Sequence, residues 1–172
     1  MKKALSAWII MFFILGTFAP AAMAASLVTF DGGIGVIPVS SAAGTQNADK
    51  TFPDVNRNDV RGVPPGGQPW VIGSLKARVD DNGNIKVKGT GLLLAGGDGI
   101  GTTGGQSVHA TLFCGPAASA SAHSTGNVPL EPNGDFRIDD MLTPLPPSLC
   151  DSPVLLIINA GGRWFAAGIP VR

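Results

Sequence analysis

The sequence lacks several features that would define a fold or an activity directly. Tyrosine is absent, no segment carries the long 3.6-residue apolar stripe of an amphipathic helix, and glycine (24) and proline (14) are abundant instead. This mixture predicts many turns and few helices. The charges are balanced, with 12 basic and 12 acidic side chains, so the chain offers no long-range field to attract nucleic acid or an anionic membrane.

Catalytic and metal-binding signatures are missing as well. The chain has no Cys-x-x-Cys pair and no nucleophile-elbow motif, and its only imidazoles are His109 and His123. In SVHATLFC the alternation points His109 away from the apolar face, and His123 lies in ASASAHSTGN, for which we expect a flexible loop. Zinc and copper sites require three or four clustered ligands. The sequence therefore predicts no catalytic residue, no metal site, no cofactor and no enzymatic activity.

The first residues have the three parts of a secretory signal peptide. Two lysines form a positive region, residues 4–18 are apolar and uncharged, and a proline precedes the small residues of Ala22-Met23-Ala24. We therefore predict a signal peptide over residues 1–24, cut between Ala24 and Ala25. An uncleaved anchor is the alternative, because about 20 apolar residues can span a bilayer, but the proline and the Ala-x-Ala site favour cleavage.

Cleavage of the predicted signal peptide indicates where the mature protein is located and how long it is. We expect a secreted or periplasmic protein of about 148 residues, one domain with its own core and no stable membrane insertion. Its only cysteines, Cys114 and Cys150, lie in the exported part. An even pair in an oxidising compartment predicts a disulfide. Closing that loop stabilises the fold by about 3–4 kcal/mol in the chain-entropy model.

The exported part divides into two regions by composition. Residues 25–69 begin with one or two short strands over Ser26–Ser40, which could dock on the core, and continue as a polar, Pro/Gly-rich flexible linker over Ser41–Pro69. Residues 70–172 carry six or seven short alternating segments separated by turn signals. This spacing predicts an all-β fold, an antiparallel Greek-key (Ig-like) β-sandwich after the signal helix.

The first strand pair of this domain allows a choice of register. A two-residue Asn-Gly turn would put the apolar side chains on conflicting faces. A three-residue loop, with Gly83 in the left-handed conformation, pairs Val79 with Ile85 and Ala77 with Val87 and places the apolar groups on one face. Burial of these apolar side chains on one face stabilises this register, so we predict the three-residue loop.

Further strands are predicted along the rest of the chain. One extends the second strand of the hairpin after two glycines that indicate a bulge or a close backbone contact. Another is apolar on both faces and is typical of a central, covered strand. The segments are Leu92–Ala95, Ser107–Cys114, Asp135–Met141, the doubly apolar Val154–Ile158, and Arg163–Ile169. For Trp70 and Trp164 we favour core or strand-end packing over sugar stacking.

Two motifs match binding patterns without the required context. Residues 99–104, GIGTTG, match the glycine pattern of dinucleotide-binding loops, but a strand pattern follows where a helix N-terminus is needed. Residues 80–84, DDNGN, are rich in oxygen ligands but lack the acids that a calcium loop requires. We interpret the first as an inter-strand loop and the second as a hairpin turn.

The predicted register creates an unusual charge arrangement on the outer face of the hairpin. Lys76 faces Lys88 and Arg78 faces Lys86, and like charges directly opposite each other are unfavourable. One hypothesis is a cationic platform for a glycan acid, a phosphate or an acidic patch of a partner. The alternative is compensation by neighbouring acids or screening by water and salt. The acids considered are Glu131, Asp135 and Asp139.

Four blocks occur in order between Val71 and Val171: GLLLAGGD, SVHATLFCGP, NGDFRIDD, and CDSPVLLI with GGRWFAAGIP. With these blocks the chain resembles a group of small uncharacterised secreted bacterial proteins, which implies export and a compact β domain. It is also similar to the CHRD domain, a β-sandwich related to the copper/zinc superoxide dismutase architecture, in VPPGGQP, in His109 ahead of GPA, and in GGRWFAAGI. The paired-histidine signature of that group is reduced here to His109, so no metal ligand is carried over.

These observations favour an exported, non-enzymatic β domain that binds a partner or has a structural role in the cell envelope. The alternative is a copper- or zinc-binding dismutase-like or CHRD-like domain that uses His109. The partner itself is not specified by the residues, although nucleic acid is excluded by charge.

Overall fold

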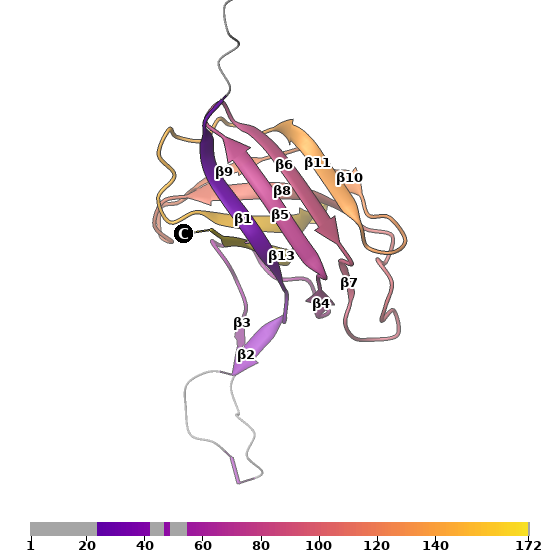
Figure 1. The fold of residues 1–172 in the computed structure, drawn as a ribbon. Helices are drawn as coiled ribbons and strands as arrows, with labels where there is room; N and C mark the ends of the chain where they lie inside the picture. Colours follow the sequence, from indigo (N-terminus) through magenta and orange to yellow (C-terminus); the bar gives the residue numbers. More distant parts are fainter. Residues whose placement is uncertain (1–23, 42–46, 49–54, 172) are drawn as a thin grey trace, which may run out of the picture.

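The computed structural model describes residues 24–41, 47–48 and 55–171, and these residues form strands and loops (Figure 1). The predicted signal peptide and much of the predicted linker lie outside the described residues. Within the described part the all-β, antiparallel prediction is confirmed. The strands are β1 (Ser26–Gly35), β2 (Val39–Ser41), β3 (Val55–Arg57), β4 (Trp70–Val71), β5 (Ser74–Asp80), β6 (Asn84–Thr90), β7 (Leu93–Leu94), β8 (Ser107–Cys114), β9 (Ser121–Ser124), β10 (Val128–Pro129), β11 (Phe136–Met141), β12 (Val154–Asn159) and β13 (Trp164–Pro170).

Nine strands form one antiparallel, nearly closed, barrel-like sheet. Its order is β10-β8-β12-β13-β1-β5-β6-β11, and β9 also pairs with β8. Figure 1 shows two layers, with β1, β5, β6 and β11 in front of β8, β9 and β13. The connections from β6 to β8 and from β11 to β12 cross between the layers, which is the Greek-key arrangement expected from the sequence. The two layers of the predicted sandwich are thus the two halves of one curled sheet.

The two edges of this sheet meet at a narrow seam. Ser124 of β9 and Thr143, which follows β11, exchange two backbone hydrogen bonds of 2.9 Å. Beside them the carboxylate of Asp140 accepts hydrogen bonds from the backbone N–H groups of Gly126 and Met141, each at 2.8 Å. These two bonds, the Gly126 bond first, hold the pKa of the Asp140 carboxyl below its usual value.

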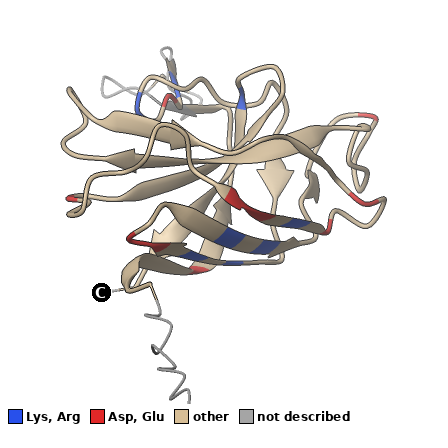
Figure 2. Ribbon diagram, turned by 90° about the horizontal axis from the view of Figure 1, so that it is seen from above, with Lys and Arg blue, Asp and Glu red and all other residues tan. Residues whose placement is uncertain are grey.

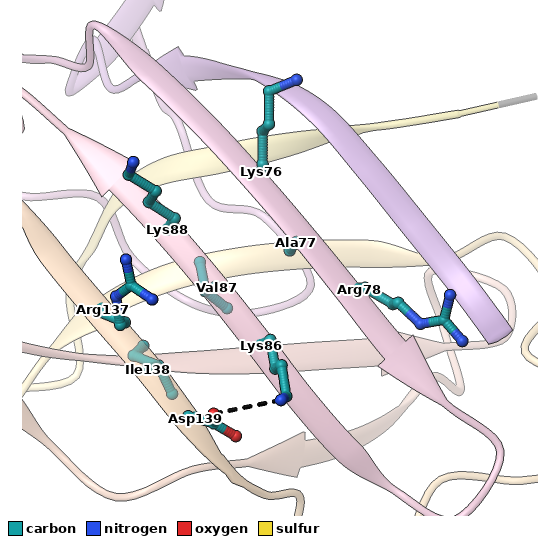
Figure 3. A pocket seen from close by; sticks show the side chains of 9 residues that line it. All are labelled: Lys76, Ala77, Arg78, Lys86, Val87, Lys88, Arg137, Ile138 and Asp139. Carbon is teal, nitrogen blue, oxygen red and sulfur yellow. Dashed lines mark ion pairs between the residues drawn. The ribbon is translucent and has the colours of Figure 1, made fainter. Parts of the chain in front are cut away.

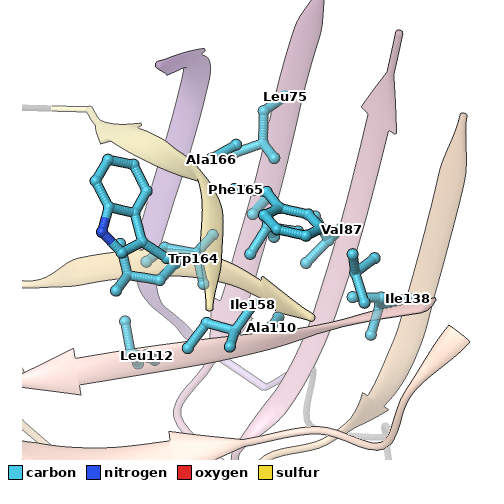
Figure 4. Close-up of a cluster of buried hydrophobic side chains, with 14 of the residues drawn as sticks. Leu75, Val87, Ala110, Leu112, Ile138, Ile158, Trp164, Phe165 and Ala166 are labelled. Atoms are coloured by element: carbon cyan, nitrogen blue, oxygen red, sulfur yellow. The ribbon is translucent and has the colours of Figure 1, made fainter. Parts of the chain in front are cut away.

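The core lies between the two layers (Figure 4). Alternation sends Leu75, Val87 and Ile138 inward from one layer, and Ala110 and Leu112 inward from the other, and all five are buried. Strand β12 is buried on both faces from Leu155 to Ile158, as its continuous apolar run predicted. The core is therefore formed by the residues that the alternation of the sequence assigns to it.

The predicted hairpin register is confirmed. Val79 pairs with Ile85 and Ala77 with Val87, across a loop of residues 81–83. Gly83 has φ 85° and its N–H donates to the carbonyl of Asp80 at 2.9 Å. Only glycine adopts this left-handed backbone without strain, which is why the loop closes in three residues.

The region before Trp70 is more closely integrated than its composition indicated. Strand β1 lies inside the main sheet, between β13 and β5. Residues 58–66 cross the outside of β12 and β13, where the indole N–H of Trp164 donates to the carbonyl of Asn58 at 2.9 Å and its backbone N–H donates to Pro64. Residues 26–35 and 58–69 therefore belong to the same body as residues 70–171.

The predicted disulfide is present. Cys114 at the end of β8 is bonded to Cys150 in the segment before β12, with the Cα atoms 4.8 Å apart. Next to it, the N–H of Gly115 donates to the carbonyl of Asp151. The bond joins the end of β8 to the connection that enters its neighbour β12 and therefore holds two strand ends together.

Candidate functional site

A group of cations lies on the outer face of three neighbouring strands, β5, β6 and β11. We call Lys76, Arg78, Lys86, Lys88 and Arg137 the basic face. Alternation places these side chains outside because their neighbours Ala77, Val87 and Ile138 point into the core. In Figure 2 the Lys and Arg positions of this layer appear as blue segments on adjacent strands. The first four are those singled out from the sequence.

Three of the five cations have a carboxylate partner. Lys76 is 3.2 Å from Asp31 of β1, Lys86 is 3.4 Å from Asp139 of β11, and Arg78 is 2.6 Å from Asp80. These are exposed ion pairs, which contribute little to stability. The predicted compensation by Asp139 is therefore correct for Lys86, and the other two partners were not anticipated.

Lys88 and Arg137 are the two cations of the basic face that make no ion pair with a described residue. Lys88 lies opposite Lys76 on one side and opposite Arg137 on the other. Among the described residues, neither Lys88 nor Arg137 has a carboxylate within ion-pair distance. Asp135 and Glu131 border the same region, but Asp135 instead accepts the N–H of Gly91 at 3.1 Å. Two adjacent positive charges thus remain without an acid partner.

A shallow, open cleft of about 280 Å³ lies among these side chains. Its floor is the backbone of β5, β6 and β11, and its rim carries the cations of the basic face together with Asp139. In Figure 3 the heads of Lys88 and Arg137 stand on the same side, while Lys86 leans toward Asp139. The shape suits a group that lies across the strands rather than one that enters a deep pocket.

Arg137 was the part of the site that sequence reasoning missed. Its outward direction followed from the alternation in DFRIDDM, but the strand beside β11 was not known. Pairing of β11 with β6 places Arg137 directly opposite Lys88. From the sequence, only a basic residue at an outward position could be predicted here, because local alternation does not determine which distant strands pair with each other.

The two histidines lie on opposite faces of the sheet. His109 faces outward, and its Nδ1 is 3.0 Å from Oδ1 of Asn127. His123 is buried within β9 and faces Leu112, so the predicted flexible loop at this position is wrong. The short polar strand SAHS lacks the apolar alternation that would have revealed it.

The ring of His123 is fully engaged. One nitrogen, Nδ1, is 2.8 Å from the carbonyl oxygen of Pro144, which only accepts, so this nitrogen carries the proton. The other, Nε2, is 2.8 Å from Oγ of Ser121 and accepts from it in the neutral ring. In the part of the chain that the structure describes, no three His, Cys, Asp or Glu side chains are grouped as metal ligands.

The remaining sequence motifs occupy the predicted places. Residues 99–104 form an inter-strand loop in which the N–H of Thr102 donates to Gly99, and β8 follows it. Residues 80–84 form the hairpin turn. Ala24 and Ala25 lie just before β1, where the carbonyl of Ala25 accepts the N–H of Asp81 at 2.9 Å.

Comparison of the chain with protein-family models, with curated proteins and with solved structures found no significant match. Within residues 24–41, 47–48 and 55–171 no helix is long and apolar enough to cross a membrane.

Proposed function

We propose that the protein is an exported, non-enzymatic binding domain that holds an anionic polymer against its basic face. The observation that carries this proposal is the row formed by Lys76, Lys88 and Arg137, one cation on each of three adjacent strands. Like charges placed opposite each other raise the free energy of the sheet. A bound anion relieves that repulsion, which gives the face a physical reason to bind.

The spacing of the row favours an extended ligand. Neighbouring strands are about 4.8 Å apart, so the three cations span about 10 Å at the level of the backbone. Successive carboxylates of an acidic polysaccharide can contact all three side chains at once, whereas a single small anion reaches only neighbouring ones. The side chain of Lys76 is 71% exposed, so a polymer reaches the row without rearrangement of the fold.

The proposed location outside the cytoplasm has two supports. Disulfides persist in oxidising compartments, and Cys114 and Cys150 are joined. The N-terminal pattern is that of a cleaved signal peptide, and a cut between Ala24 and Ala25 leaves β1, which starts at Ser26, complete. An exported protein meets the acidic polymers of an envelope or its surroundings, which matches the chemistry of the basic face.

The test compares two variants of equal net charge. Replacing Lys88 and Arg137 with Gln removes two positive charges from the basic face. The substitution Arg57→Glu changes the net charge by the same amount on β3, where Arg57 is half exposed and paired with Asp59. Binding to immobilised polygalacturonate at low salt should weaken about tenfold or more in K88Q/R137Q, because charge-assisted contacts are lost.

R57E should bind like the unmodified protein, and neither variant should be retained on neutral dextran. Added salt should release the unmodified protein, since exposed charges are screened within about 10 Å at 0.1 M. Equal losses in both variants would mean that only net charge matters, and an unchanged K88Q/R137Q would end the proposal.

A further inference from the structure

A second hollow, of about 330 Å³, lies at one end of the sheet and away from the basic face. It is bounded by the start of β13, the end of β12, the residues before β8 and the chain that enters β4. We call it the end pocket. Its lining differs from that of the basic face, because it combines aromatic and aliphatic walls with amide side chains and one arginine.

The end pocket contains an indole N–H without an acceptor. Trp70 is 5% exposed, and its ring stacks on Phe165 with the centroids 3.9 Å apart. Trp164 donates its indole N–H to Asn58, whereas the indole N–H of Trp70 has no partner among the described residues. The indole nitrogen of Trp70 is not fully enclosed. Among the described residues, the one side-chain nitrogen or oxygen that is both enclosed and without a hydrogen-bond partner belongs to Arg61. The indole N–H of Trp70 is therefore open to solvent and can donate a hydrogen bond to a ligand.

Gly66 keeps this donor uncovered. A Cβ atom at Gly66 would lie 3.0 Å from the ring of Phe165 and 3.1 Å from Nε1 of Trp70. The backbone at Gly66 does not have a positive φ, so its conformation alone does not call for glycine. The missing side chain leaves space beside the indole nitrogen. Gly67, its neighbour, has open space around it.

Two amide acceptors of the end pocket are already in use, whereas the side chain of Gln68, which also lines it, makes no hydrogen bond with a described residue. Oε1 of Gln106 accepts from Nδ2 of Asn159 at 2.8 Å, and Oδ1 of Asn159 accepts the backbone N–H of Arg163 at 2.9 Å. Arg163 is exposed and has no ion pair with a described residue, and no Asp or Glu lines the pocket. The pocket is therefore rich in donors and carries one positive charge.

We infer that the end pocket binds a small carboxylated sugar. The carboxylate pairs with the guanidinium of Arg163, and hydroxyl oxygens accept from the indole N–H of Trp70 and from amide N–H groups. The C–H faces of the ring contact Leu94 and Phe165, which line the pocket. A hollow of about 330 Å³ has room for one sugar ring. This inference does not depend on the basic face, which lies on other strands.

The experiment follows the indole N–H resonances of Trp70 and Trp164 in ¹⁵N-labelled protein. D-glucuronate, D-glucose and acetate are added separately, so that ring and carboxylate are tested together and apart. Glucuronate should shift the Trp70 signal in a saturable way, while the Trp164 signal stays in place because its N–H is held by Asn58. Glucose and acetate should produce much smaller shifts.

Three variants locate the effect. R163Q should weaken glucuronate binding about tenfold, the equivalent of one charge-assisted contact, and G66A should abolish it by filling the space beside the indole. G67A should bind normally, and K88Q/R137Q should keep the Trp70 shift even if it loses polygalacturonate. The inference is overturned if glucuronate leaves the Trp70 signal unmoved, if acetate or glucose acts equally well, or if R163Q, a surface change that leaves the core intact, binds unchanged.

Discussion

At the scale of single residues, Asp140 has a defined structural task. Its carboxylate binds the N–H of Gly126 across the seam and that of Met141 on its own strand. Both bonds favour the ionised form, so the pKa of Asp140 is lowered in the folded protein. Because the pKa of Asp140 is lower in the folded protein than in the unfolded chain, its ionisation stabilises the fold. This stabilisation is complete above the pKa of the unfolded chain, near 3.8, and is lost as the pH falls through the pKa of the folded protein.

The substitution Asp140→Asn should therefore destabilise the protein at pH 7 and have less effect at pH 3. Because the carboxylate is exposed to solvent, we expect a loss of about 1 kcal/mol or less at pH 7. Urea unfolding of both proteins at the two pH values measures the difference. D98N is the matched control, since Asp98 is exposed and makes no ion pair or hydrogen bond with a described residue. An effect of D140N that is the same at both pH values, or is shared by D98N, would contradict this role.

At the scale of strands, β6 and β11 fit together through a glycine and an aromatic ring. Gly89 of β6 is paired with Phe136 of β11, and a Cβ atom at Gly89 would collide with that ring. Phe136 is only 4% exposed, so it has little room to move aside. The sequence predicted a bulge or a close backbone contact at Gly89 and Gly91. At Gly89 the structure shows the ring of Phe136 packed against the glycine, which brings β11, with Arg137, against β6.

The substitution Gly89→Ala should lower the free energy of unfolding by about 1–3 kcal/mol, the usual cost of overpacking. Chemical denaturation measures it. Gly67→Ala should be nearly neutral, because nothing lies within 4 Å of the added atom. Combining G89A with F136L should cost less than the sum of the two single changes, since the smaller side chain frees the space. Strict additivity would show that Gly89 and Phe136 are not coupled.

Local patterns predicted the elements whose register is set by near neighbours. The β5–β6 hairpin, β8, β11 and β12 follow from alternation and from one left-handed glycine, so four of the five basic-face residues were found. Strand β1 was underestimated because its pairing with β13 shifts register between Phe30 and Gly33 and interrupts the alternation. Its neighbours β5 and β13 are distant in sequence, as is Trp164 from Asn58. Such pairings depend on the whole topology, which single segments do not encode.

At the scale of the whole molecule, the curled sheet separates two surfaces of different chemistry. The basic face lies outside β5, β6 and β11, and the end pocket lies at the entrance to β13. The seam joins the edge of the back layer to that of the front layer, and the disulfide ties the end of β8 to the connection that enters β12. A rigid body of this kind can hold a polymer on one surface and a single sugar ring in the other site, each without a change of shape.

The proposed export of this single, disulfide-closed body is tested most directly by the intact mass of the protein recovered from outside the cytoplasm. The sample is treated with an alkylating agent, with and without prior reduction. We predict the mass of residues 25–172 less two hydrogens, with no alkylation until a reductant is added and two alkyl groups afterwards. A protein that keeps residues 1–24, or that has Cys114 and Cys150 alkylated without reduction, would contradict the proposed location and the assembly described here.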